Sequence, residues 1–244
     1  MSRLVFAALC ALVLAGCATR APERPPPLTA LPDVGPNFLV PAAHERMVYL
    51  ARQEWSLFGS PVVVRNHTDA PTLAFPPGTP ATHEVQGPML SRVMMYWYAV
   101  SRAPIVGTQG ELRPWSAAFI SWLARGAGFT HDEFPDTLLH WDYIERFLAT
   151  RDGAFVARDP ARYAPRVGDL VCNSRGIAQS FGSLRRGAYH CDLVVGASAD
   201  AVDAIGGNVG DVVAMSRLEV DANGLLRPLA DRPWAAVLER RDVR

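Results

Sequence analysis

Ser116 is the residue with the clearest potential for chemistry, because it lies where a helix is expected to begin. Pro114 is typical of a first helical turn, and apolar residues at helical spacing follow it as far as Gly126. Backbone N–H groups at a helix start favour a negative charge by about 0.3–1 kcal/mol. This is too little to ionise a serine hydroxyl, so a nucleophilic Ser116 needs a histidine as its base. The alternative is that Ser116 only caps the helix.

Six histidines could supply that base, and one stands out by its position. They are His44, His67, His83, His131, His140 and His190. His190 opens the apolar run of residues 189–195, which predicts a buried strand that could hold its ring in one orientation. Alternation along this strand places His190, Asp192 and Val194 on one face and turns Cys191 away, which makes Cys191 a poor nucleophile. The alternative for His190 is an ordinary packed or surface imidazole.

The composition excludes several classes of function. The chain has 24 basic and 24 acidic residues, and every basic residue is an arginine. Without lysine there can be no serine–lysine dyad, Schiff base or P-loop, and without a basic excess we expect no nucleic-acid partner. The sequence also lacks HExxH and CxxC motifs, so we expect no metal or other cofactor.

The first 16 residues resemble an export signal. An apolar run at residues 4–14 follows Arg3 and is too short to span a bilayer. The letters LAGC, which end at Cys17, resemble a bacterial lipobox, so we expect cleavage after residue 16 and a lipid anchor on Cys17. The residue after Cys17 is Ala18, and not the aspartate that would favour retention away from the outer membrane. Its absence indicates a protein that is anchored in the outer membrane and faces the periplasm. The alternatives are an ordinary signal peptide and a buried N-terminal helix.

Proline content and helical periodicity divide the rest of the chain into three parts. Residues 17–41 are rich in proline, which predicts an extended tether. Residues 42–101 form an N-terminal helical part, with helices predicted at 42–58 and 89–100 and a loop with one short strand between them. Residues 102–240 contain Ser116 and are predicted to form the functional domain.

Two cysteines remain once Cys10 and Cys17 are assigned to export. Cys172 and Cys191 each lie in a short apolar run, so they could form a disulfide between neighbouring strands in an oxidising compartment. Two buried free thiols are the alternative.

Four motifs in order, spread over residues 114–211, resemble a known class of fold. They read WSAAFISW, PRVGDLVC, HCDLVV and AIGGNVGD. Their order is similar to that of the CHAP and NlpC-type papain-like amidases and peptidases of bacterial cell walls. The resemblance implies an α+β fold with helices packed on a small antiparallel β-barrel or sheet. Residues 54–143, with EWSLFG, RVMMYWYAV, PWSAAFIS and HWDYI, also resemble a family of bacterial lipoproteins catalogued only as a domain of unknown function.

The papain-like resemblance implies a role for three residues. The nucleophile, histidine and asparagine of the family fall on Ser116, His190 and Asn208, although the family's nucleophile is a cysteine. The imidazole would take the serine proton, the asparagine would orient the imidazole, and helix-start N–H groups would stabilise an oxyanion. The glutamate of the family's E-x-N pair falls on Gly206, so the acidic partner is missing.

Four other residues are weaker candidates for the site. Asp192, on the face of His190, or Asp203 could replace the missing glutamate. Trp115 could line a substrate-binding cleft, although an indole beside a helix start is usually packed. His140 is a further candidate, whose alternative role is to cap or cover the barrel.

Two functions remain. The first is an envelope lipoprotein with a serine-type amidase or peptidase that acts on peptidoglycan or its stem peptides, with a muropeptide as substrate and the membrane as partner through Cys17. The second is a catalytically inactive relative that binds cell-wall peptides or an envelope partner. A lipid or ester acyl hydrolase is a third, more distant reading.

Overall fold

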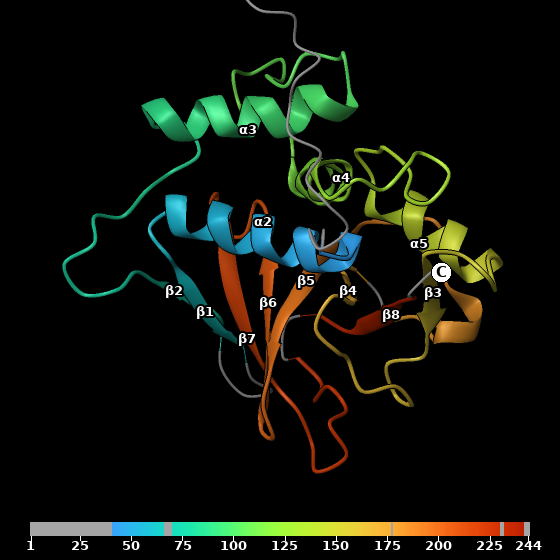
Figure 1. Ribbon diagram of the computed structural model, residues 1–244. Helices are drawn as coiled ribbons and strands as arrows, with labels where there is room; N and C mark the ends of the chain where they lie inside the picture. Colours follow the sequence, from blue (N-terminus) through green and yellow to red (C-terminus); the bar gives the residue numbers. More distant parts are fainter. Residues whose placement is uncertain (1–40, 66–69, 177, 230–231, 242–244) are drawn as a thin grey trace, which may run out of the picture. The chain divides into compact units, whose positions relative to one another are not determined.

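The structure, a computed structural model, describes residues 41–65, 70–176, 178–229 and 232–241 (Figure 1). The export signal, Cys17 and all of the tether except Pro41 lie outside these residues. Among the described residues, no helix has the length and apolar character needed to cross a membrane. From Pro41 onward they form one compact unit.

A mixed β-sheet is the framework of this unit (Figure 1). The strands in the described residues are β1 Val62–Arg65, β2 Thr72–Ala74, β3 Phe155–Arg158, β4 Leu170–Ser174, β5 Tyr189–Ala197, β6 Ala201–Gly206, β7 Ala214–Glu219 and β8 Trp234–Arg240. They lie in the order β2-β1-β7-β6-β5-β4-β8-β3. Neighbours run antiparallel, except that β1 and β7 are parallel. The α+β class is therefore confirmed, but the sheet is open, with β2 and β3 as its edges.

The helices of the described residues are α2 Ala43–Leu57, α3 Gly87–Val100, α4 Ser116–Gly126 and α5 His140–Ala149. The first three agree with the helices expected from sequence periodicity, whereas α5 was not expected. The central helix is α4, which contacts α2, α3 and β5. Almost every side chain of α4 is buried, because its alanines and aromatic residues leave no polar face for solvent.

The sheet has an apolar core on each face. Cys172, Cys191 and Leu193 belong to the large core that the helices share, whereas Val171 and Val194 belong to a smaller core with residues of β6, β7 and β8. Side chains along β5 therefore alternate as the sequence predicted. Asp192 lies on the face of Val194, and Cys191 points away from it.

A buried ion pair joins α2 to α3. Glu54 of α2 is almost completely buried and accepts hydrogen bonds from the Arg92 guanidinium and the Tyr96 hydroxyl of α3. Removing one partner of such a pair would leave an uncompensated buried charge. The pair therefore fixes α3 relative to α2, with α4 packed against both.

The N-terminal helical part is not separate from the rest of the unit. Its strand β1 pairs with β7, with Val62 opposite Met215, and so extends the same sheet. Residues 42–101 and 102–240, which the sequence divides, consequently share one framework.

A disulfide joins β4 to β5. Cys172 and Cys191 lie opposite each other in the strand register and their sulfurs are bonded, so the alternative of two free thiols is not what the structure contains. Cys191 lies between His190 and Asp192 in sequence. The bond therefore anchors the strand segment that presents both of these side chains.

Replacing both cysteines with alanine should lower the free energy of unfolding by about 3 kcal/mol. The reason is that the disulfide closes a loop in the unfolded chain between two residues with a sequence separation of 19, and so lowers the entropy of that chain. Urea unfolding followed by circular dichroism measures the change. A reducing agent should destabilise the wild-type protein by a similar amount and leave the double variant unchanged. Equal unfolding midpoints for oxidised and reduced wild-type protein would contradict this expectation.

Candidate functional site

Ser116 is the first residue of α4, and its hydroxyl is engaged by a histidine. Ser116 Oγ lies 2.7 Å from His140 Nε2. No side chain caps α4, so the alternative in which Ser116 serves as a helix cap does not describe the structure. The N–H groups of a first helical turn have no partner within the helix, and those of α4 therefore surround the serine with hydrogen-bond donors.

His140 is held as a neutral imidazole. It begins α5, is buried, and its Nδ1 contacts the hydroxyl of Tyr143 one turn later. Burial lowers the pKa of His140 well below 6.5, and electrostatic interactions with His190 and Arg175 lower it further. Burial likewise raises the pKa of Tyr143, so its phenol stays protonated. When Nδ1–H donates to Tyr143, Nε2 has a free lone pair that can accept the Ser116 proton. In the other tautomer, Nε2–H donates to Ser116.

His190 makes a different pair of hydrogen bonds from those expected. Its Nδ1 lies 3.0 Å from Arg175 Nη2, and its Nε2 lies 2.7 Å from Asp192 Oδ1. Because a guanidinium can only donate, Nδ1 must accept, and Nε2–H must donate to Asp192. Both nitrogens are thus occupied. The serine hydroxyl pairs with His140 instead of His190, and the two imidazole rings lie 5.3 Å apart.

Asp192 fills the space left by Gly206. A methyl group at position 206 would lie 1.7 Å from Asp192 Oδ1 and 3.1 Å from His190 Nε2. Burial raises the pKa of Asp192, but His190 and the positive charges of Arg65 and Arg232 outweigh this and hold it below 3.8, so the group is a carboxylate. Asp192 therefore occupies the place expected for the acidic partner of His190.

Asp203, the other candidate for that place, lies elsewhere. It belongs to β6, where Gly196 of β5 is its partner, and one of its carboxylate oxygens is 4.0 Å from Arg217 Nε. It makes no hydrogen bond to His190.

Asn208 is bound to Glu84 and makes no bond to His190. It follows β6 with a left-handed backbone φ of 57°, and its Nδ2 donates to Glu84 Oε2 at 3.1 Å. The same carboxylate oxygen accepts the indole N–H of Trp115 at 2.6 Å. Burial raises the pKa of Glu84, and a bond from Trp115 opposes this. The predicted role of Asn208 in orienting His190 is therefore not seen, because Glu84 holds its amide beside Trp115.

Trp115 is a packing residue in this structure. Its side chain is completely buried and contacts the rings of Phe58, Tyr96 and Phe119. It lines no open cleft. Through Glu84 it instead ties the start of α4 to Asn208 and the end of β6.

Four residues of the site were not found by sequence reasoning. One is Tyr143, whose hydroxyl contacts His140 Nδ1. Arg175 donates to His190, Glu84 binds Asn208, and Asn173 lies opposite His190 in the register of β4 and β5. The amide oxygen of Asn173 is buried and has no hydrogen-bond partner in the structure. Only Asn173 had a sequence signal, since it is a polar residue that directly follows the apolar run Leu170–Cys172 of β4. Glu84 lies in a stretch rich in proline, threonine and glycine, which carries no periodicity.

The side chains at the centre of the cluster are buried, whereas Arg175 beside them is exposed. Ser116 is 4% exposed, His140 5%, His190 1% and Asp192 4%. Within the described ranges, no group of three or more histidine, cysteine, aspartate and glutamate side chains is placed to hold a metal ion.

Comparison with protein families gives a match over residues 91–241. The family is described as an uncharacterized protein conserved in bacteria (DUF2272). The match covers more than half of the chain and includes α4, α5 and the strands from β3 to β8. Comparisons with curated proteins and with solved structures give no match.

Gly206→Ala should lower the free energy of unfolding by about 1–3 kcal/mol, because the new methyl group would displace the Asp192 carboxylate. In an Asp192→Ala background, the same change should cost much less, since the space is then free. Urea unfolding of the four proteins of this cycle measures the coupling. Gly196→Ala is the matched control, because its methyl group would make ordinary contacts 3.6 Å from Asp203. Additive effects of the Gly206 and Asp192 changes would refute the steric relation.

The free energy of unfolding should decrease as the pH falls below about 6.5, the ordinary pKa of histidine. Unfolded His140 takes up a proton in this range, whereas folded His140, with its lower pKa, does not. The unfolded state then binds more protons, so this residue removes up to about 1.4 kcal/mol of stability per pH unit. The carboxylate of Asp192 does not contribute here, because its pKa lies below 3.8.

Urea unfolding of the wild-type protein and of His140→Asn at about pH 7 and about pH 5 tests this linkage. The variant lacks the titrating group, so its stability should fall less over the same interval. Parallel pH dependences of the two proteins would mean that His140 titrates alike in the folded and unfolded states.

Proposed function

The chain belongs to the DUF2272 family of bacterial proteins, and we propose that it is a serine-type acyl hydrolase in which Ser116 is the nucleophile and His140 its general base. One observation carries this proposal: Ser116 Oγ lies 2.7 Å from Nε2 of a buried, neutral imidazole at the start of a helix. A serine hydroxyl needs such a base in hydrogen-bonding reach, and an imidazole kept neutral can accept its proton.

The proposed reaction uses groups already in place. His140 Nε2 takes the Ser116 proton as Oγ attacks a carbonyl carbon, while Nδ1–H is held by the Tyr143 hydroxyl. N–H groups at the start of α4 stabilise the oxyanion of the tetrahedral intermediate. The protonated His140 then gives its proton to the leaving group as the carbonyl–leaving-group bond breaks. A water, deprotonated by His140, hydrolyses the resulting ester and restores the serine.

The papain-like arrangement, with His190 as the base and Asn208 as its orienting residue, is a second form of the same proposal. It requires Arg175 to release Nδ1 of His190 and Asn208 to leave Glu84. The serine at a helix start and the antiparallel sequence β4–β5–β6, with a histidine near the start of β5, support the resemblance to papain-like folds. Asp192 would complete this site in place of the missing glutamate.

The resemblance to cell-wall amidases and peptidases makes peptidoglycan, or its stem peptides, the proposed substrate. The lipobox-like sequence ending at Cys17 supports an anchored protein on the outer membrane that faces the periplasm, where this substrate is found. The disulfide between Cys172 and Cys191 agrees with an oxidising compartment.

A catalytically inactive relative that binds wall peptides or an envelope partner is the second candidate. The observation in its favour is burial: Ser116 is only 4% exposed, and Arg175 occupies the nitrogen of His190 that faces away from Asp192. In this case the polar cluster would stabilise the fold and the serine would never meet a carbonyl group.

Incubation of the purified protein with muropeptides and with a fluorophosphonate probe separates the two candidates. Ser116→Ala should abolish both product formation and labelling, and His140→Gln should lower the rate by at least about 100-fold. Ser121→Ala is the control, because Ser121 is a second buried serine in the same helix. His190→Gln should have a smaller effect than His140→Gln if His140 is the base, and a larger one in the papain-like arrangement. Equal labelling of wild-type protein and Ser116→Ala would reject catalysis by Ser116.

A further inference from the structure

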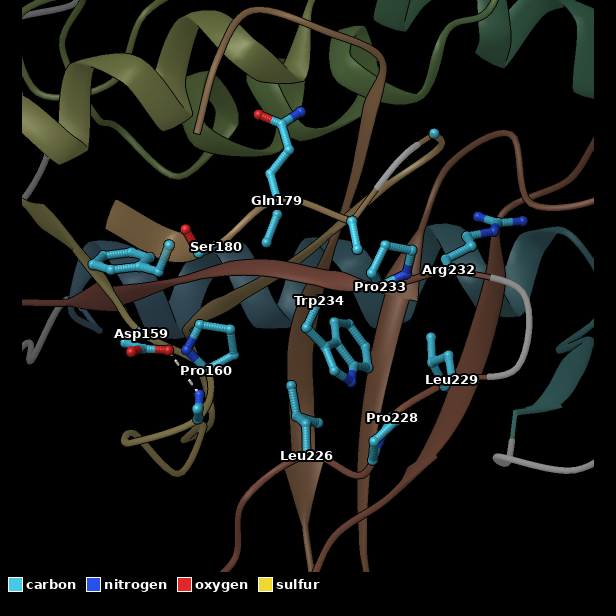
Figure 2. Close-up of a pocket in the computed structure, with 15 residues that line it drawn as sticks. Asp159, Pro160, Gln179, Ser180, Leu226, Pro228, Leu229, Arg232, Pro233 and Trp234 are labelled. Carbon is cyan, nitrogen blue, oxygen red and sulfur yellow. Dashed lines mark hydrogen bonds between the residues drawn. The ribbon is translucent and has the colours of Figure 1, made fainter. Parts of the chain in front are cut away.

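A cavity of about 670 Å³ lies on the other side of β4 from His190. Its walls come from residues 159–161 after β3, residues 176 and 178–181 after β4, and residues 226, 228, 229 and 232–235 before and within β8 (Figure 2). Most of the lining is apolar. It includes Pro160, Phe181, Leu226, Leu229, Pro233 and Trp234. This volume and character are those of pockets that bind small ligands.

The cavity has one acidic and one basic side chain, which lie far apart. Figure 2 shows Asp159 and Arg232 at opposite ends, with the Trp234 ring between them. The Asp159 side chain is 34% exposed, and its nearest ion-pair contact is weak, with Arg162 Nε at 3.9 Å. A ligand with a positive charge at one end, a negative charge at the other and an apolar centre would match these walls.

The strand β4 lies between the cavity and the strand that carries His190. Trp234 of β8 lies opposite Asn173 of β4, and Asn173 lies opposite His190 of β5. Side chains that are directly opposite in antiparallel strands share a face of the sheet, so the three residues form one row. Asn173 is 4% exposed and its amide oxygen has no partner. Asn173 is not itself one of the lining residues, so it marks a buried polar position between the cavity and His190.

The electrostatic environment agrees with an anionic group at the Arg232 end. Arg232 is close enough to Asp192 to lower the pKa of that carboxyl group. Burial is the main cause that lowers the pKa of Arg175, and the positive charges of Arg232 and Arg65 lower it further. The negative charge of Asp192 acts in the opposite direction and raises it. The positive charge of Arg232 would attract a ligand's anionic group to this end of the cavity.

We propose that this cavity binds a short peptide with free ends, with its ammonium group towards Asp159, its carboxylate towards Arg232 and an apolar side chain against Trp234. The assignment of this peptide as the substrate or product of Ser116 rests on the proposed function, whereas its binding does not.

Isothermal titration calorimetry on the full chain carrying Ser116→Ala tests the proposal without turnover. The probes are the tripeptide Ala-Leu-Ala, its C-terminal amide and its N-acetyl form. The free tripeptide should bind at least about tenfold more tightly than either blocked form, because each block removes one charge. Arg232→Gln should remove the preference for the free carboxylate only, and Asp159→Asn the preference for the free amine only. Arg217→Gln, an exposed arginine of β7, should retain both preferences.

Several outcomes would overturn the proposal. These are equal affinity for the three peptides, absence of binding at about 10 mM, and preferences that survive Arg232→Gln and Asp159→Asn. If Arg232→Gln does not fold, Arg232→Lys keeps the charge and should retain a weakened preference for the carboxylate. Binding by the Ser116→Ala protein with no turnover by the wild type would uphold this site and reject the hydrolase. Turnover of muropeptides without any end-group preference would uphold the hydrolase and reject this site.

Discussion

The buried carboxylate of Asp192 is the constraint on which the site depends. A charge removed from water costs several kcal/mol unless it is paired and hydrogen-bonded. Asp192 meets this requirement by accepting Nε2–H of His190, and it fits only because position 206 is glycine. That bond leaves Nδ1 of His190 as an acceptor, which Arg175 occupies. With both nitrogens of His190 used, His140 is the imidazole that engages Ser116.

The scaffold around this pair holds Ser116 by several independent contacts. The helix α4 is buried between α2, α3 and the sheet, so the position of its first residue is set by core packing. Glu84 ties Trp115, directly before the serine, to Asn208 at the end of β6. The disulfide holds β4 and β5 in register at the pair directly next to Asn173 and His190. A site built on rigid elements can hold hydrogen-bonding geometry that a loop could not.

Local periodicity predicted much of this architecture. Patterns of apolar residues over short stretches of sequence predicted the helices α2, α3 and α4 and the alternation of side chains along β5. The helix α5 was missed because no capping side chain marks its start, where Leu139 is the N-cap residue. The sheet was expected to be antiparallel, and the parallel pairing of β1 with β7 was missed because it joins strands across about 150 residues of chain. Sequence spacing carries no signal for such a pairing.

The sequence by itself determined that a serine begins a helix and that His190 and Asp192 share a strand face. Both are consequences of backbone geometry over a few residues. Only the tertiary structure decided that Ser116 hydrogen-bonds to His140 and that His190 hydrogen-bonds to Asp192. It also decided that the amide of Asn208 donates to Glu84. These contacts depend on how side-chain volumes and charges pack together in the core. Gly206 is one determinant, because the absence of a side chain there leaves room for the Asp192 carboxylate.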